Sequence, residues 1–383
     1  MDIREFQFYF AGFIPYRDRL LIISYENFLM EFDLNKSVIQ FAKGLNTEVC
    51  GRLAPYHAER FLQIGKNLLI ISMWGKEVYI YDAESDRWDM LDIDCHQKEW
   101  GNFLGIFESK ELVYIVPRYR EYIIGINPAT KRIQRLNCSF ISQLDVENVV
   151  SCLKDDFLYF FDGTNHCVSI FYLKTGKCQY IKVDGILGKI AAVQYHENTF
   201  YILFESGKTV VWNEQDSSLE TVIAPIDEAL PACFAQLVVT DKNIWLLPAL
   251  GEDIYVYDHR DKILEQYEDY PEKLEYLDFE NYYKFVAGTR YEDKIYFAMH
   301  SANHLLSIDI NTGKAEWFYP KFPTVEQADA FRRYHGLSLV KNEKDTSLNV
   351  FLHEISQAKE DDEIKYEWKR KLIGSDIWDK LGE

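Results

Sequence analysis

The sequence predicts an all-β protein, a single β-propeller of four-stranded antiparallel blades that forms one domain over residues 1–383. Three observations predict this fold. Short apolar runs alternate with polar turns along the chain, an anchor residue recurs every 41 to 51 residues, and no long stretch shows the i, i+3, i+4 pattern of an amphipathic helix. A period of this length, built from short strands, is typical of a propeller.

Each copy of the repeat contains an apolar strand, a short turn, a second strand that ends in the anchor, a turn of four or five residues and a third strand. The copies cover residues 20–41, 68–91, 112–136, 157–181, 200–222, 244–267, 295–318 and, in degenerate form, 348–368. The anchors are Asp33, Asp82, Asn127, Tyr172, Asn213, Asp258, Asp309 and Glu354. A further apolar segment precedes each copy, so each repeat supplies the four strands of one blade.

The turn after the anchor agrees with this interpretation. An Asp or Asn side chain can accept a hydrogen bond from the backbone two residues further on, and Gly176 and Gly313 supply the positive φ that such a turn requires. Eight anchors predict eight blades, and seven blades with a terminal extension are the alternative. The N-terminal strand 3–8 is expected to pair with the last blade, because this pairing would close the ring and cover an open sheet edge.

Composition limits the possible partners. The chain has 42 Lys and Arg against 61 Asp and Glu, and its formal charge of −19 opposes binding to nucleic acid or to an anionic membrane surface.

No apolar run is long enough to span a membrane, and the N-terminus does not show the pattern of a secretory signal. The seven cysteines form no C-x-x-C pair and are interpreted as reduced thiols. We therefore expect a cytoplasmic protein.

Two segments resemble known propeller repeats. DINTGKAEW, residues 309–317, resembles the repeat of the eight-bladed quinoprotein-like propellers, which are also called PQQ-like, and YDAESDRW, residues 81–88, resembles the kelch repeat. The resemblance implies a propeller fold. The chain has neither the adjacent cysteine pair of the quinoprotein dehydrogenases nor the Gly-Gly doublet of kelch blades, so the resemblance implies no activity and no cofactor.

One face of the ring is expected to bind a ligand. In a meander, the turns between second and third strands share a face with the crossovers between blades, and the longest aromatic loops of this chain fall there. Cationic and aromatic side chains in these loops would suit an anionic or aromatic ligand. The candidate ligand-binding residues are Tyr56, Trp74, Trp100, Arg118, Tyr119, Tyr282, Tyr283, Arg332, Arg333 and Tyr334.

Four histidines on the same face support an alternative. If His57, His166, His300 or His335 met at the channel mouth, a pair could act as acid and base in a lyase, epimerase or isomerase. His300 and His304 could approach each other across one hairpin, but no third ligand is evident beside them, so we predict no metal site.

The sequence thus favours a non-catalytic binding or scaffolding propeller over an enzyme. Its expected partner is a protein, a peptide or a small anionic ligand, held on the crossover-loop face, with no cofactor, no nucleic acid and no membrane. An enzyme would need two titratable side chains that converge on one pocket.

Overall fold

A computed structural model describes most of the first 326 residues. The described residues are 10–16, 19–24, 28–44, 58–65, 67–72, 77–82, 85, 87–93, 103–109, 112–145, 148–226, 234–249, 253–272, 274, 285–299, 304–322 and 324–326. The chain divides into two units, Met1–Gln327 and Ala328–Glu383, and every described residue belongs to the first unit. A single domain over 1–383 therefore stays a prediction. Within the described residues, no helix is long and apolar enough to cross a membrane.

The described residues form seven blades, each a four-stranded antiparallel meander in chain order. Blade 1 contains β1 (Phe10–Tyr16), β2 (Arg19–Ser24), β3 (Phe28–Asp33) and β4 (Val38–Gly44). Blade 2 contains β5 (Ala58–Ile64), β6 (Asn67–Ser72), β7 (Glu77–Asp82) and β8 (Arg87–Asp92). Blade 3 contains β9 (Phe103–Ser109), β10 (Leu112–Pro117), β11 (Tyr122–Asn127) and β12 (Arg132–Asn137). Blade 4 contains β13 (Val149–Lys154), β14 (Phe157–Asp162), β15 (Cys167–Tyr172) and β16 (Lys177–Lys182).

The remaining three blades follow the same plan. Blade 5 contains β17 (Ile190–His196), β18 (Thr199–Phe204), β19 (Thr209–Trp212) and β20 (Leu219–Ile223). Blade 6 contains β21 (Phe234–Val239), β22 (Asn243–Pro248), β23 (Tyr255–Asp258) and β24 (Ile263–Gln266). Blade 7 contains β25 (Phe285–Tyr291), β26 (Lys294–Met299), β27 (Leu305–Asp309) and β28 (Ala315–Phe318). A 3-10 helix that the sequence did not predict, η1 (Ser139–Gln143), joins blades 3 and 4 and buries Ile141.

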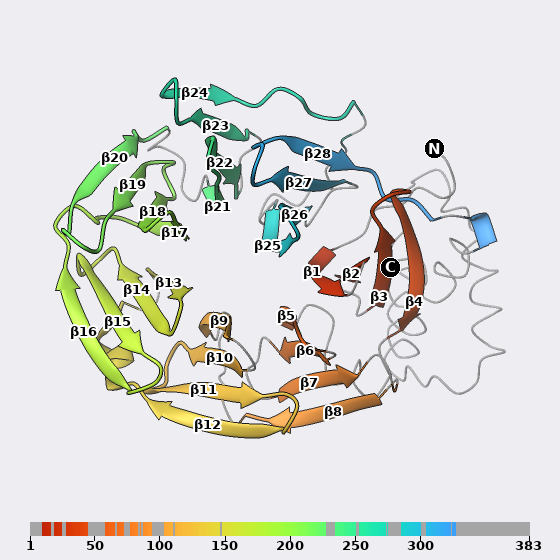
Figure 1. Cartoon of the computed structure of the whole chain (residues 1–383), viewed down its shortest axis with the longest axis horizontal. Helices are drawn as coiled ribbons and strands as arrows, with labels where there is room; N and C mark the ends of the chain where they lie inside the picture. Colours follow the sequence, from red (N-terminus) through yellow and green to blue (C-terminus); the bar gives the residue numbers. More distant parts are fainter. Residues whose placement is uncertain are drawn as a thin grey trace, which may run out of the picture. The chain divides into compact units, whose positions relative to one another are not determined.

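The blades are arranged around a central axis, with the first strand of each blade innermost and the fourth outermost (Figure 1). Strand β1 of blade 1 contacts β25 and β26 of blade 7 directly. The expectation of eight blades is therefore corrected to the seven-bladed alternative, because no further blade fits between two sheets that touch. The degenerate copy 348–368 and the N-terminal strand 3–8, which was expected to close the ring, lie outside the described residues.

Contacts at the outer edge also join blade 7 to blade 1. The segment after β28 runs parallel to β4, where the Ile39 N–H donates to the Lys321 carbonyl at 2.8 Å and the Lys321 N–H donates to the Ser37 carbonyl at 3.3 Å. Beneath them the rings of Phe32 and Phe318 meet edge to face with centroids 5.8 Å apart. Among the described residues, backbone pairing and aromatic packing thus join the first and seventh blades.

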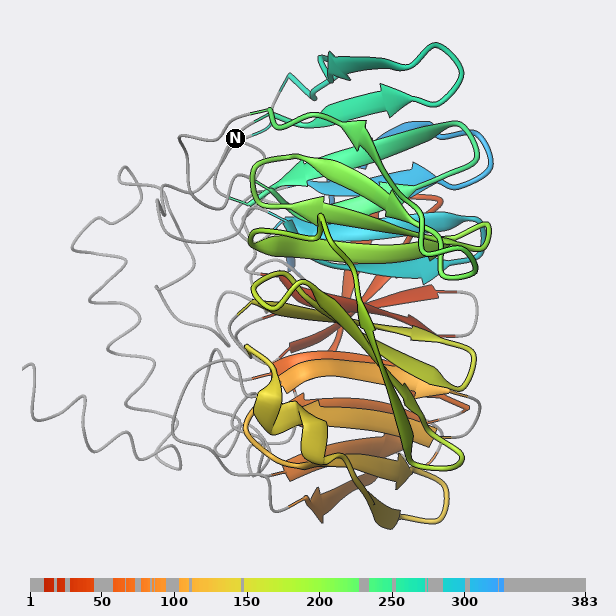
Figure 2. The ribbon, with the colours of Figure 1, turned by 90° about the vertical axis from the view of Figure 1, so that its left-hand side faces the viewer.

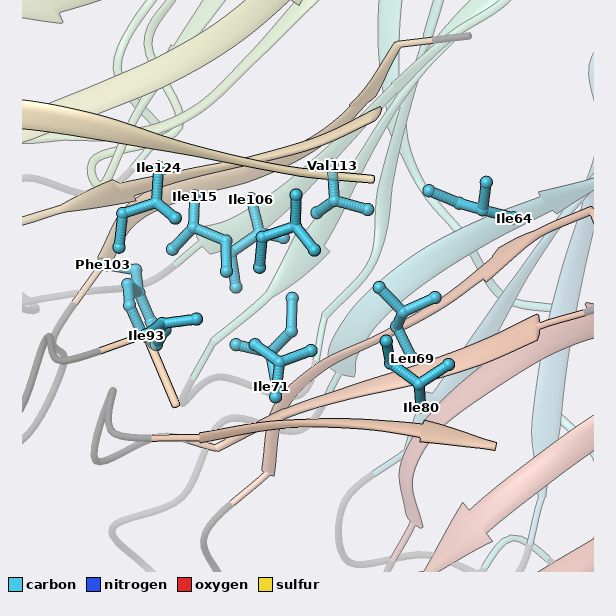
Figure 3. Packing of buried hydrophobic residues seen from close by; sticks show 12 residues of the cluster. Ile64, Leu69, Ile71, Ile80, Ile93, Phe103, Ile106, Val113, Ile115 and Ile124 are labelled. Carbon is cyan, nitrogen blue, oxygen red and sulfur yellow. The ribbon is translucent and has the colours of Figure 1, made fainter. Parts of the chain in front are cut away.

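The hydrophobic core lies in the seams between neighbouring blades. Between blades 2 and 3, Leu69, Ile71 and Ile80 face Ile115 and Ile124, all of them buried (Figure 3). Fully burying one such side chain stabilises the fold by about 1.5–3 kcal/mol. The outermost strands are different, since those of blades 3 and 4 (RIQRLN and KCQYIK) are almost entirely exposed. Their Lys and Arg side chains protect the outer edges against pairing with other chains.

The aromatic residues concentrate in the seam between blades 4 and 5. Trp212 is fully buried there, with its ring centroid 5.9 Å from that of Phe161 and 5.5 Å from that of Phe200. Tyr159 packs on Phe200 with centroids 4.6 Å apart. Aromatic pairs in such tilted and edge-to-face geometries add to the free energy gained from burial alone.

The predicted anchor turns are confirmed. The carboxylate of Asp258 accepts hydrogen bonds from the N–H groups of Arg260 and Asp261, both at 2.8 Å, and Asp309 accepts from Asn311 and Thr312 at 3.0 and 2.7 Å. These backbone bonds lower the pKa of both carboxyl groups. Where the anchor is Tyr172, the backbone closes the turn instead, because Gly176 with φ +67° donates to the Tyr172 carbonyl.

Asp162 is different from the anchors because its carboxylate is completely buried, at the turn between β14 and β15. One oxygen accepts from the backbone N–H groups of Thr164 and Asn165, at 3.0 and 2.9 Å. The other accepts from the Asp145 N–H at 3.0 Å and from the Asn165 side-chain amide at 2.8 Å. Both oxygens are therefore engaged, and the turn is tied to the crossover that enters blade 4.

The same turn approaches the next crossover closely. A Cβ atom on Gly163 would lie 2.0 Å from the carbonyl oxygen of Gly188, which leaves room only for glycine. The Gly188 N–H donates to the Gly163 carbonyl at 3.3 Å. Consequently the 162–165 turn connects the crossovers on both sides of blade 4.

We predict that Asp162→Asn lowers the free energy of unfolding by about 2–4 kcal/mol, because the new amide group cannot accept the two hydrogen bonds now made to one buried oxygen. Asp258→Asn is the matched control, since it keeps an acceptor at an exposed turn and should change stability much less. Urea denaturation of the two variants and the wild type measures this. Equal midpoints for the two variants would contradict the assignment.

Candidate functional site

The turns of the propeller divide between two faces, as the side view shows (Figure 2). The hairpin face carries the turns between first and second strands and between third and fourth strands. The crossover face carries the turns between second and third strands and the connections between blades. Described turns of the hairpin face include 155–156, 173–176, 197–198, 213–218, 241–242 and 259–262; those of the crossover face include 118–121, 163–166 and 205–208.

Three of the sequence-predicted site residues are described, and all three lie on the predicted crossover face. Arg118 and Tyr119 are in the β10–β11 turn of blade 3, and His166 is in the β14–β15 turn of blade 4. The other candidates, for binding and for acid–base work, lie outside the described residues: Tyr56, His57, Trp74, Trp100, Tyr282, Tyr283, His300, Arg332, Arg333, Tyr334 and His335. Whether these side chains converge with Arg118 thus remains a prediction.

Arg118 presents an unusual donor. Its side chain is half-buried, and its Nε–H is shielded from solvent and has no hydrogen-bond acceptor among the described residues. A buried donor left without an acceptor costs about 1–3 kcal/mol. Tyr119 beside it is 44% exposed, and Arg120 is exposed as well. The turn therefore offers one desolvated cationic donor next to an accessible aromatic ring.

A second unpaired group lies on the same face in the neighbouring blade. The side-chain amide of Asn148, just before β13, donates to Asp145 at 2.8 Å, while its carbonyl oxygen is buried and has no donor among the described residues. The backbone of His166 takes part in the turn: its φ is +54°, and its carbonyl accepts a hydrogen bond from the Val183 N–H at 2.8 Å. Arg118 and Asn148 are thus the described polar groups of this face with unused hydrogen-bonding capacity in a buried position.

The hairpin face carries a polar network that sequence analysis did not identify. Glu214, in the β19–β20 turn, accepts from the Tyr159 hydroxyl at 2.9 Å and pairs with Lys154 at 3.0 Å. The Lys154 ammonium also lies 4.6 Å from the centre of the Tyr195 ring. Burial, followed by the bond to Glu214, raises the pKa of Tyr159. Lys154 and Glu214 are paired with each other, so this network joins blades 4 and 5 and leaves no charged group free to bind a ligand.

Next to it, two hairpin turns of blades 5 and 6 bring titratable groups together. His196 is the last residue of β17, Glu197 follows it in the β17–β18 turn, and Asp241 lies in the β21–β22 turn. The Tyr201 ring contacts two imidazoles edge to face, with centroids 6.4 Å from that of His196 and 6.2 Å from that of His259. Burial lowers the pKa of His259. No single-hairpin pattern in the sequence could reveal this cluster, because its members come from two blades.

His304, at the start of β27, is packed as a core residue. It is 3% exposed, and its ring stacks on Tyr319 with centroids 4.7 Å and planes 12° apart. Burial lowers the pKa of this imidazole to about 4. Protonation of this imidazole is therefore opposed by its burial. Its expected neighbour across the hairpin, His300, lies outside the described residues.

Comparisons with known proteins identify the fold and nothing narrower. No protein-family model and no curated protein sequence matches the chain. Among solved structures, it is similar to PorZ, an essential bacterial surface component of the type-IX secretion system of Porphyromonas gingivalis, at 12% identity and a TM-score of 0.53 over 84% of this chain. It is also similar to the computationally designed Ika8 protein, at 12% identity and a TM-score of 0.51 over 81% of this chain and 86% of that one.

These similarities limit what can be transferred. The chain spans 39% of the length of PorZ, and identities this low show a common fold alone. The propeller is therefore confirmed, while the quinoprotein-like and kelch families suggested by the two sequence segments are not.

We predict that His304 makes stability depend on pH. Its pKa is about 4 in the folded protein and about 6.5 in the unfolded chain, so unfolding takes up a proton between these values. The stability is complete above pH 6.5 and falls by up to about 3 kcal/mol as the pH drops to 4. His304→Phe keeps a ring on Tyr319 without the titration. Between pH 7 and pH 4, the free energy of unfolding, measured by denaturation at each pH, should fall less steeply for this variant than for the wild type. An equal fall in the two proteins would contradict the lowered pKa of His304.

Proposed function

We propose that this protein is a non-catalytic binding or scaffolding propeller that holds an anionic group of a protein, a peptide or a small acid on its crossover face. The buried, unpaired Nε–H of Arg118 is the observation that carries the proposal. A carboxylate could accept from this donor and satisfy it. Arg is well suited to this role because its guanidinium stays charged and can present two parallel donors to a carboxylate.

The residues around Arg118 favour recognition of a larger partner. Tyr119 projects an aromatic surface that is 44% exposed, and Arg120 adds a second cation beside it. Tyr and Arg are the residue types that most often dominate the free energy of protein interfaces. A formal charge of −19 repels polyanions from most of the molecule, so an anion must be recognised locally through specific hydrogen bonds. The cytoplasmic location and the protein or peptide partner belong to the same proposal.

The alternative, an acid–base enzyme, depends on a second histidine that meets His166. The half-buried side chain of His166 lies on the proposed face, while His57, His300 and His335 lie outside the described residues. Because no observation on the described residues favours this alternative over binding, we retain the binding function.

The test compares ligands that carry a free carboxylate with ligands that lack one. Thermal-shift and calorimetric titrations compare short peptides with free C-terminal carboxylates against their amidated versions, together with small di- and tricarboxylic acids. Only ligands with a carboxylate should raise the melting temperature, and Arg118→Met should weaken their affinity by about tenfold to a hundredfold. Arg132→Met, at an exposed position on the outer strand β12, is the matched control and should bind normally.

The stability of the free protein separates a binding role from a structural one. Because the Nε–H of Arg118 makes no hydrogen bond to a described residue, Arg118→Met should leave the free energy of unfolding unchanged or raise it slightly. A strongly destabilised variant would show that Arg118 serves the fold. Carboxylate ligands that bind Arg118→Met as tightly as the wild type would overturn the proposal.

A further inference from the structure

On the hairpin face, two turns bring three potential metal ligands together across the seam between blades 5 and 6. The His196 imidazole comes from the end of β17, the Glu197 carboxylate from the β17–β18 turn, and the Asp241 carboxylate from the β21–β22 turn. One ligand atom from each lies within 4.8 Å of the other two. His196 and Asp241 are one repeat apart in the chain, so the propeller geometry itself makes them neighbours.

The contact between His196 and Asp241 is close without being a hydrogen bond. Nε2 of His196 lies 3.2 Å from a carboxylate oxygen of Asp241, yet this nitrogen is shielded from solvent and has no hydrogen-bond partner among the described residues. The distance suits a hydrogen bond, but the direction of the ring nitrogen does not. A cation bound on the lone-pair side of this nitrogen would lie within reach of the Asp241 carboxylate.

The two turns are held in position by interactions independent of the cluster. Two residues before His196, the Gln194 amide donates to the Val239 carbonyl at 3.1 Å and accepts from the Val239 N–H at 2.9 Å. Val239 itself is two residues before Asp241. The backbones that carry the ligands of both blades are therefore joined by a pair of hydrogen bonds, which fixes the separation of the two turns before any ion binds.

Each turn also has its own internal support. The Thr199 hydroxyl donates to the His196 carbonyl at 2.9 Å, and the Tyr195 hydroxyl donates to the side chain of Asn198 at 3.1 Å. In the facing turn, the Thr240 hydroxyl accepts from the backbone N–H groups of Lys242 and Asn243, at 3.2 and 3.0 Å. This support reduces the freedom that ion binding would otherwise have to remove.

We propose that this seam, formed by His196, Glu197 and Asp241, binds a divalent metal ion of the zinc class. Two carboxylates and a neutral imidazole supply a charge of −2, and nitrogen with carboxylate oxygen is a ligand set that zinc accepts. Ligand atoms of a tetrahedral zinc site are about 3.4 Å apart. To form a site of that size, the exposed Glu197 and Asp241 side chains would rotate toward the imidazole.

The bound ion would act as a clamp between two blades. It would connect turns that are otherwise joined by the Gln194 side chain, and solvent would complete its coordination on the exposed side, where Asp241 is 64% exposed. Any ion that binds the folded state alone stabilises it by mass action. No metal site was predicted from the sequence, because only ligands within one hairpin were considered there. The ligands of this site come from two blades.

The experiment titrates ZnCl2 into the full chain after dialysis against EDTA, with binding followed by calorimetry and stability by thermal shift. We expect the wild type to bind zinc at this site and to melt at a higher temperature. His196→Ala and Asp241→Asn should each lose one equivalent of zinc or weaken its binding at least tenfold. His166→Gln and Asp184→Asn are matched controls on the crossover face and should bind as the wild type does.

Three results would overturn the proposal: no zinc binding by the wild type, identical zinc binding by the wild type and both hairpin-face variants, or displacement of zinc by equimolar MgCl2, which would exclude a role for the imidazole. Near-UV circular dichroism checks that the variants fold, and His196→Gln replaces His196→Ala if the latter does not. Because Arg118→Met lies on the other face and should leave zinc binding unchanged, this test is independent of the proposed function.

Discussion

The need to bury both faces of every blade is the constraint on which the rest of this structure depends. In β14, successive residues point to opposite sides: Leu158 and Phe160 pack into the seam with blade 3, whereas Tyr159 and Phe161 pack into the seam with blade 5. A four-stranded sheet cannot cover two apolar faces by itself, so each blade is stable only between two neighbours. The direct contact of β1 with β25 satisfies this requirement for the first and seventh blades and closes the ring.

This constraint decides where chemistry can be located. In blades 3 to 5 the second and third strands bury most of their side chains, so the charged groups that could bind an ion or a ligand lie in the turns or beside them. Those turns are not loosely attached. Asp162 ties the 162–165 turn to the preceding crossover, and Gln194 joins the inner strands of blades 5 and 6. Side-chain hydrogen bonds of this kind hold the short loops in fixed positions, and precise binding requires such rigidity.

The two proposed sites differ in charge. On the crossover face, the Arg118 guanidinium offers a desolvated donor to an anion, and on the hairpin face, Glu197, Asp241 and His196 offer two negative charges and an imidazole to a cation. In a chain with a formal charge of −19, the second arrangement agrees with the overall field and the first opposes it. Anion binding must therefore depend on short-range hydrogen bonds, while cation binding also gains from the long-range field.

The sequence by itself determined the strands, the turns and the period, because each depends on neighbours within one repeat. The apolar run in FLYFFD predicted a strand, and Asp258 and Asp309 predicted turns that their own backbone bonds confirm. Only the tertiary structure decided the number of blades, since the contact between β1 and β25 joins the two ends of the ring. It also decided which polar groups meet. His196 and Asp241 lie in different repeats, and the unpaired state of Arg118 depends on everything packed around it, so neither could be derived from local sequence.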